Sequence, residues 1–170
     1  MNIDDKTYFD RFDTATINRQ DKEHFLHPFQ VFDVFSEEGA LPIAAARDAY
    51  IYDSDGRKYL DAVGGLWCTN IGLGREEMAD AIAHQVRQMA YASPFVDMTN
   101  IPAAQLSAKL AELAPGDLNH VALSCGGSTA IDTAYRLIHF YQNCRGKHDK
   151  KHVISRVNSY HGTTYAAMSI

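Results

Sequence analysis

Hydrophobic residues recur along this chain with two spacings, which predict helices in some stretches and strands in others. Apolar residues at one-sided helical spacing predict helices from Glu76 to Met89, from Pro102 to Leu113 and from the turn at Ser128 to about Arg145. Pro102 suits the first turn of a helix, and Gly146 suits the position just after a helix end. Two short apolar runs, at 119–124 and 151–157, flank the third helix and predict strands.

A β-hairpin is predicted over residues 49–61. Aromatic and branched residues at 49–52 and 58–61 flank the turn sequence Asp53-Ser-Asp-Gly-Arg57. This turn also looks like the first half of a calcium-binding loop, but the later ligands and the glutamate at the twelfth position are missing. A plain turn is therefore favoured. Residues 1–35 are polar with scattered aromatic residues and predict an arm with one short helix, which packs its aromatic side chains against a larger body.

The order of elements around the third helix predicts the fold class. A strand, a helix and a second strand joined by a short glycine turn form the repeating unit of an open, mainly parallel α/β sheet. The chain has 170 residues, enough for one domain. Its last residues, 166–170, are mostly apolar, whereas complete domains usually end in polar, exposed residues. We therefore expect that the last element is cut in its middle.

Composition narrows the class of function. The 16 basic and 21 acidic residues give a net charge of −5, and 46% of residues are hydrophobic, which argues against disorder and against nucleic-acid binding. No run approaches the ~20 apolar residues of a membrane span, and the first six residues lack a signal-peptide pattern. The histidines and the three cysteines lack the spacing of a metal site or disulfide framework. We expect a cytoplasmic protein with reduced thiols, without metal, membrane or nucleic-acid partners.

Three segments carry residues suited to chemistry. Gly126-Gly127-Ser128 precedes a helix, where free N–H groups can bind a phosphate. The alternative is a tight turn with Ser128 as N-cap, and the pattern alone favours neither.

Tyr160-His161-Gly162 follows the next predicted strand, so it belongs to the same sheet edge, where Tyr160 can stack on a planar ring. A lone histidine in such a loop is more often simply solvated. Trp67 lies in a stretch with four glycines, as a core anchor or a pocket wall. Cys125 is interpreted as a packing residue.

Together these segments resemble the amino-terminal part of class III, or omega-amino acid:pyruvate, aminotransferases, which are fold-type I enzymes that use pyridoxal 5'-phosphate. The resemblance runs from about His27 to Ile170. It rests on motifs in a fixed order: His27-Pro-Phe29, Asp53-x-Asp-Gly56, Tyr59-Leu-Asp61, Gly64-Gly-Leu-Trp-Cys-x-Asn-Ile-Gly-x-Gly-Arg75, Gly126-Gly-Ser-x-Ala-x-Asp132 and Tyr160-His-Gly-x-Thr164. It implies a small-domain region over residues 1–75, with the arm and hairpin, and an incomplete large cofactor-binding domain over residues 76–170.

The resemblance also assigns roles to residues. It implies that Gly126, Gly127 and Ser128 hold the cofactor phosphate, that Tyr160 stacks on the pyridine ring, and that His161 and Gly162 lie beside it. It places Leu66, Trp67 and Phe95 in the wall of the substrate pocket. Many family members have a glutamate after the phosphate-binding serine or threonine, where this chain has Thr129, so the substrate range is less defined than the cofactor.

No catalytic residue is assigned in this chain by the resemblance. The family's lysine that binds the cofactor covalently, and its aspartate at the pyridinium nitrogen, lie downstream of the Tyr-His-Gly motif. We expect a portion of a homodimeric transaminase that moves nitrogen from an amine or ω-amino acid to an oxo acid such as pyruvate, inactive without the missing C-terminal part. The alternatives are an aminomutase of the same fold and a catalytically incomplete chain that only binds a ligand or assembles.

Overall fold

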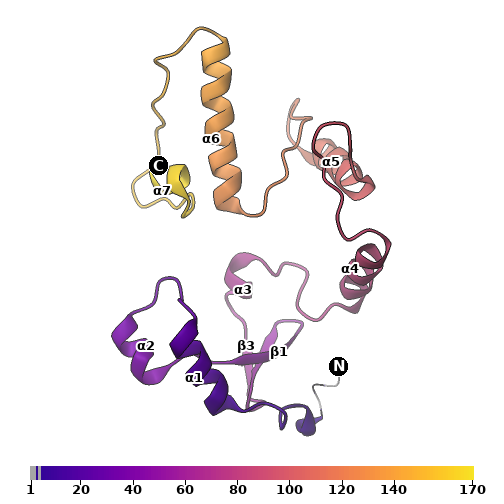
Figure 1. Ribbon diagram of the computed structural model, residues 1–170, viewed down its shortest axis with the longest axis vertical. Coiled ribbons are helices and arrows are strands. Elements are labelled where there is room, and N and C mark those ends of the chain that lie inside the picture. The colour runs from indigo at the N-terminus through magenta and orange to yellow at the C-terminus, as the bar shows by residue number, and fades with distance from the viewer. Residues whose placement is uncertain (1–2, 4) are drawn as a thin grey trace. The chain divides into compact units, whose positions relative to one another are not determined.

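An antiparallel sheet of three strands organises the first of two compact units, which comprise Met1–Tyr91 and Ala92–Ile170 (Figure 1). The computed structural model describes residue 3 and residues 5–170. The strands are β1 (Ile43–Arg47), β2 (Tyr50–Asp53) and β3 (Lys58–Leu60), paired in that order. The pair β2–β3, with Ile51 opposite Tyr59, confirms the predicted hairpin. The sequence pattern does not predict β1, because its alanines lack the alternation of a half-buried strand.

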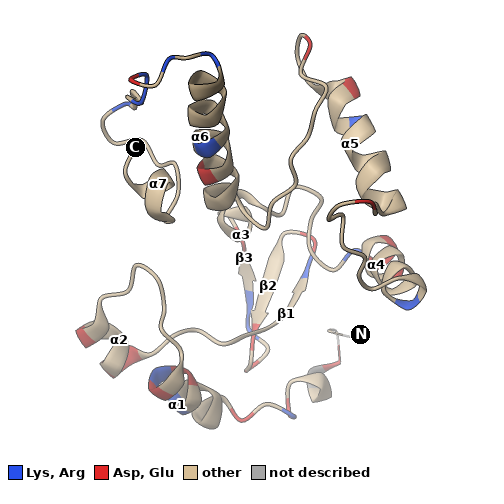
Figure 2. Cartoon of the chain, turned by 45° about the horizontal axis from the view of Figure 1, so that its top comes forward, with Lys and Arg blue, Asp and Glu red and all other residues tan. Residues whose placement is uncertain are grey.

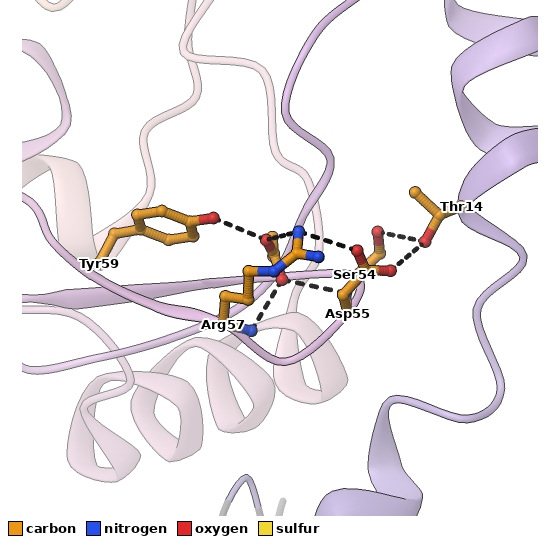
Figure 3. A network of polar contacts seen from close by, with 6 residues as sticks. Thr14, Ser54, Asp55, Arg57 and Tyr59 are labelled. Atoms are coloured by element: carbon orange, nitrogen blue, oxygen red, sulfur yellow. Dashed lines mark hydrogen bonds and ion pairs between the residues drawn. The ribbon is translucent and has the colours of Figure 1, made fainter.

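The hairpin turn is stabilised by the carboxylate of Asp53, which is 1% exposed. Figure 3 shows Asp55, Arg57 and Tyr59, the residues around this carboxylate. It accepts hydrogen bonds from the backbone N–H groups of Asp55 (3.0 Å) and Arg57 (2.8 Å) and from the Tyr59 hydroxyl (2.8 Å). Burial by itself raises the pKa of Asp53, but these hydrogen bonds and the Arg57 guanidinium outweigh it and hold the pKa below its usual value. Protein donors thus occupy this carboxylate, which supports the plain turn over the calcium loop.

The amino-terminal arm packs against the hairpin, as its scattered aromatic residues predict. Ile3, Phe9 and Ala45 are buried together, and the Phe9 ring is stacked at 6.3 Å from the Tyr52 ring. The prediction of a single short helix is wrong, because the arm holds the 3-10 turn η1 (Lys6–Tyr8) and two helices, α1 (Thr14–His24) and α2 (Phe32–Glu38). Residues 1, 2 and 4 of the expected arm lie outside the described residues.

Contacts outside the hydrophobic pattern stabilise these arm helices. The Asp13 side chain caps α1 by accepting from the backbone N–H of Thr16 at 3.1 Å. The Lys22 ammonium donates to the last-turn carbonyls of Ser36 and Glu37, both at 2.9 Å, and so satisfies the C-terminal end of α2. Such capping is visible only once the two helices are placed, so the periodicity of the arm underestimates its helical content.

The three predicted amphipathic helices are confirmed as α4 (Glu76–Gln88), α5 (Ile101–Leu113) and α6 (Gly127–Cys144). The Asn100 side chain caps α5 by accepting from the backbone N–H of Ala103 at 2.9 Å. The chain also forms two four-residue helical turns, α3 (Gly64–Trp67) and α7 (Tyr165–Met168), and α7 packs against α6 in the second unit. Among the described residues, no helix combines the length and the apolar character needed to cross a membrane.

The expectation of strands at 119–124 and 151–157 is wrong for the described part of the chain, where neither segment belongs to a ladder. An apolar run predicts burial, but a strand exists only through hydrogen bonds to a neighbouring strand. Val121 is 36% exposed and Ile154 is 96% exposed, so neither segment has a covering partner here. The mixed α/β class is confirmed with an antiparallel sheet. The mainly parallel sheet and the domain boundary at residue 75 stay predictions for a longer protein.

Candidate functional site

The first turn of α6 offers backbone N–H groups to open space. Gly126 is the N-cap of this helix, and the Gly126 carbonyl accepts from the Ala130 N–H (3.0 Å) and the Thr129 hydroxyl (2.8 Å). No side chain caps the helix and its first turn is free of acidic residues. A methyl group built on Gly127 would meet no atom within 4 Å. This geometry fits a bound phosphate, because both the N–H groups and the helix dipole favour an anion.

Ser128 is not the N-cap, contrary to one of the two sequence interpretations. It lies inside the first turn, and its hydroxyl oxygen accepts from the backbone N–H of Thr163 at 3.0 Å. The Thr164 hydroxyl donates to the Ser128 carbonyl at 3.2 Å. One turn further, the Asp132 carboxylate accepts from the Ala167 N–H at 2.8 Å and caps α7. The loop after Tyr160 is therefore held on the turn that begins α6.

Gly162 allows this close approach. Its φ is +145°, and a methyl group built there would lie 2.7 Å from the Ser128 hydroxyl oxygen and 2.7 Å from the Ala167 Cβ. Gly162 is buried, whereas Tyr160 is 72% exposed. The His161 ring nitrogen Nε2 lies 3.1 Å from the Ser159 hydroxyl. The structure thus brings Gly162 directly onto Ser128 and leaves the Tyr160 ring free to meet a ligand.

The sequence patterns missed Asp132 and Thr163 as parts of this junction. A signal was present for Asp132, because residues i and i+4 of a helix lie on one face and Asp132 is four residues after Ser128. For Thr163 there was no local signal. Its backbone contact with Ser128 spans 35 residues of sequence and depends on the path of the intervening chain.

The expected pocket residues are strongly exposed in both units. Leu66 (68% exposed) and Trp67 (81% exposed) lie on α3 in the first unit, and Phe95 (77% exposed) lies in the second unit. The backbone of α3 is left-handed, with φ of +58° at Gly65, +66° at Leu66 and +64° at Trp67. The glycine-rich sequence predicts an irregular segment here, and the structure confirms it: the segment contains a left-handed turn with non-helical backbone angles.

Basic and sulfur-containing side chains do not form a second site in the described residues. Figure 2 shows basic residues gathered in the link between α6 and α7, where Lys147, Lys150 and Lys151 are exposed. Lys109 pairs with Glu112 at 2.9 Å. Cys68, Cys125 and Cys144 are free and exposed. Residue 3 and residues 5–170 contain no cluster of histidine, cysteine and acidic side chains able to hold a metal ion.

Comparisons with known proteins place these features in one family. The family model of the class-III aminotransferases matches residues 33–170. The putrescine–pyruvate aminotransferase of Pseudomonas aeruginosa is 40% identical over 149 residues, which are 88% of this chain and 33% of that enzyme. The crystal structure of an (S)-enantioselective omega-transaminase from Thermomicrobium roseum matches with a TM-score of 0.91 and 33% identity, covering 93% of this chain and 35% of that one.

A second similar structure is a thermostable omega-transaminase variant in which a tryptophan is replaced by glycine, engineered for the asymmetric synthesis of enantiopure bulky amines. It has a TM-score of 0.88 and 32% identity, and the match covers 90% of this chain and 34% of that one. The chain belongs to the class-III aminotransferase family. It spans about one third of the length of the relatives that it matches.

Proposed function

We propose that this chain is the amino-terminal portion of a pyridoxal 5'-phosphate-dependent aminotransferase, which moves an amino group from an ω-amino acid or another amine to pyruvate or a similar oxo acid. The observation that carries the proposal is the junction between the open first turn of α6 and the loop of Tyr160, His161 and Gly162. This junction joins a turn suited to phosphate to the loop that carries an exposed aromatic ring, in a chain that belongs to the class-III family.

Each residue of the junction has a role in binding. The N–H groups at Gly126, Gly127 and Ser128 hold the phosphate. A serine hydroxyl has one proton to donate and lone pairs to accept, so Ser128 accepts from Thr163 and donates its proton to a phosphate oxygen. Tyr160 covers one face of the cofactor ring, with His161 beside it. When bound, the cofactor supplies an electron sink for the chemistry at the amine carbon.

The family resemblance implies that Leu66, Trp67 and Phe95 line the substrate pocket of the complete enzyme. Their exposed apolar surfaces suit the wall of a pocket for the carbon skeleton of an amine. Support comes from the similar omega-transaminase variant, in which loss of a tryptophan is associated with bulky amines. Diamines are one candidate class of donor, because the relative from Pseudomonas aeruginosa is named for putrescine.

We propose that the complete enzyme is a longer protein than this chain. We propose that its C-terminal part carries the lysine that binds the cofactor covalently and that the enzyme is a homodimer, as the family resemblance implies. We also propose that it is cytoplasmic, as the sequence pattern predicts. The exposed apolar side chains of α4, α5 and α6, such as Ile82, Leu106 and Phe140, support further covering by protein. The aminomutase alternative is not favoured, because the similar relatives are named aminotransferases.

The test compares two cofactor forms in a full-length enzyme that carries this segment. Ser128→Ala removes a hydrogen bond to a charged phosphate, so we expect the Kd for pyridoxal 5'-phosphate to rise about tenfold or more. The Kd for pyridoxal, which lacks the phosphate, should rise less, because that form loses only the support that Ser128 gives to the Tyr160 loop through Thr163. Ser36→Ala, which removes a hydroxyl hydrogen bond to the Asp33 carbonyl in the first unit, is the matched control. An equal loss of affinity for both forms would contradict the phosphate-binding role.

A further inference from the structure

Leu66 and Trp67 adopt a backbone conformation that L-amino acids avoid. Four consecutive residues have positive φ, with values of +59° at Gly64, +58° at Gly65, +66° at Leu66 and +64° at Trp67. The two glycines tolerate this region, but at the two residues with side chains the Cβ approaches the following carbonyl oxygen. Strain of this kind persists only where surrounding contacts determine the conformation. Some contact must therefore hold this turn.

Asp61 provides that contact at the start of the turn. Its carboxylate oxygen Oδ2 accepts from the backbone N–H of Gly65 at 2.8 Å, and its carbonyl oxygen accepts from the N–H of Gly64 at 3.3 Å. Within the turn, the N–H of Trp67 bonds the Val63 carbonyl at 2.9 Å. Asp61 thus does for a left-handed turn what an N-cap residue does for an ordinary helix, with the added strength of an ionised acceptor.

The position of Asp61 is itself determined by the sheet. It directly follows β3, and its N–H donates to the Ala49 carbonyl at 2.9 Å. Gly65 cannot be replaced without a clash, because a methyl group built there would lie 2.6 Å from the Thr69 Cγ2. The hairpin, Asp61 and Gly65 therefore form a continuous connection from the regular sheet to the backbone that carries Trp67.

We propose that Asp61 is a positioning residue that keeps the Leu66–Trp67 turn left-handed and thereby sets which amines the substrate pocket accepts. The proposal rests on the proposed role of Trp67 in the pocket wall. Without the carboxylate, Leu66 and Trp67 can relax to the right-handed or extended regions, and the direction of the indole ring changes with them. Asp61 needs no contact with the substrate for this effect.

The first measurement is amide hydrogen exchange, resolved to single residues, in a full-length enzyme that carries this segment. Asp61→Ala should speed exchange at residues 64–68 about tenfold or more, while residues 50–60 keep their protection. Asp61→Asn keeps an acceptor but loses its charge, so Gly65 should exchange only several-fold faster. The matched control is Asp13→Ala, which removes another backbone cap in the same unit and should affect only α1. Unchanged exchange at residues 64–68 in Asp61→Ala overturns the proposal.

The remaining outcomes are also decisive. If Asp61→Ala also speeds exchange at residues 50–60, the hairpin itself has opened, and the Asp61→Asn variant is then the test. Faster exchange at Gly65 alone in Asp61→Asn supports the proposal, and unchanged exchange there overturns it.

The second measurement is the ratio of kcat/KM for a small and a bulky amine in Asp61→Ala, Trp67→Ala and the double variant. The two single changes should shift the ratio in the same direction, and the double change should add little to Trp67→Ala.

This second measurement separates the two proposals. A shift in Trp67→Ala without one in Asp61→Ala overturns the positioning role and leaves the proposed function standing. If neither variant shifts the ratio, Trp67 is not part of the pocket wall, and the positioning role falls with it. A parallel shift, together with faster exchange confined to residues 64–68, supports both.

Discussion

The hydroxyl oxygen of Ser128 accepts a hydrogen bond from the backbone N–H of Thr163 at 3.0 Å. This bond joins the first turn of α6 to the loop that carries Tyr160, which lies more than thirty residues later in the chain. Because the same hydroxyl keeps its proton, the bond positions Ser128 without removing its capacity to bind a phosphate. The proposed phosphate-binding turn and the loop that carries the aromatic ring are therefore mechanically linked.

Gly162→Ala should break this link. The new methyl group would lie 2.7 Å from the Ser128 oxygen and 2.8 Å from the Ser128 Cβ, so α6 and the loop must separate. We expect a loss of about 1–3 kcal/mol in the free energy of unfolding, typical of overpacking, and weaker binding of pyridoxal 5'-phosphate in a full-length enzyme. Urea denaturation and cofactor titration measure the two effects.

Gly127→Ala is the stability control for that change. A methyl group at Gly127 meets no atom within 4 Å, and alanine favours a helix, so we expect this variant to unfold at a slightly higher urea concentration than the parent. If Gly162→Ala is as stable as the parent, the contact between α6 and the loop is looser than the structure indicates.

Tyr160→Ala should weaken retention of the cofactor. An aromatic stacking contact contributes about 0.5–1.5 kcal/mol beyond the area that it buries, so the Kd for pyridoxal 5'-phosphate should rise by roughly two- to tenfold. Tyr160→Phe keeps the ring and should retain most of the affinity. The Tyr160 side chain is 72% exposed, so neither change should lower the melting temperature of the apoprotein appreciably. An unchanged Kd in Tyr160→Ala would argue against stacking.

The sequence predicted features whose causes are local. The helix α5 follows from Pro102 near its start and from its apolar spacing, and the hairpin follows from the Asp-Gly turn between aromatic residues. The phosphate-binding candidate, Gly126-Gly127-Ser128, is likewise visible as a glycine turn before a helix. In each case the information lies within a few residues of the element that it specifies.

Features that depend on distant partners could not be predicted. The runs at 119–124 and 151–157 have the composition of strands, but pairing requires a neighbour that the local sequence does not specify. The contact of Ser128 with Thr163 depends on the full path of the chain between them. The left-handed φ of Leu66 and Trp67 could not be predicted for a different reason. The intrinsic preferences of these two residues oppose it, and Asp61 imposes it through its hydrogen bond to Gly65.

Asp53 should make stability depend on acid pH. Because its hydrogen bonds and Arg57 hold its pKa in the folded protein below the unfolded value of about 4, the unfolded chain binds more protons at moderately acidic pH. Its contribution to stability is therefore present above pH 4 and is lost as the pH falls through the lowered, folded pKa. Urea denaturation from pH 6 to pH 3 should show this loss.

Asp53→Asn should flatten that dependence and lower the free energy of unfolding at neutral pH by roughly 2–4 kcal/mol, because three donors lose an ionised acceptor that is itself buried. Tyr59→Phe removes one of the three hydrogen bonds to the carboxylate and should reduce the pH dependence only in part. If Asp53→Asn keeps the full acid sensitivity of the parent, other carboxylates cause it.

Trp67→Ala should change selectivity for amine size in a full-length enzyme. Removing a large ring from a pocket wall creates room for bulky amines and removes contacts with small ones, so the ratio of kcat/KM for the two should shift by about tenfold or more. The exposure of the indole, 81% of its surface, means that stability should change little. Leu41→Ala, another exposed apolar truncation in the first unit, provides the control. An unchanged ratio would make Trp67 a structural residue.

The 170-residue chain alone should have no transaminase activity. Three of its lysines already have polar partners: Lys22 donates to two backbone carbonyls, Lys109 pairs with Glu112, and Lys151 donates to Asn143. Exposed apolar side chains such as Ile154 and Val157 also favour aggregation or association with a covering segment. The experiment mixes purified chain with pyridoxal 5'-phosphate, reduces with borohydride and maps labelled lysines by mass spectrometry. We expect weak, scattered labelling. Stoichiometric labelling of one lysine together with turnover of an amine would show that this segment is itself a complete catalyst.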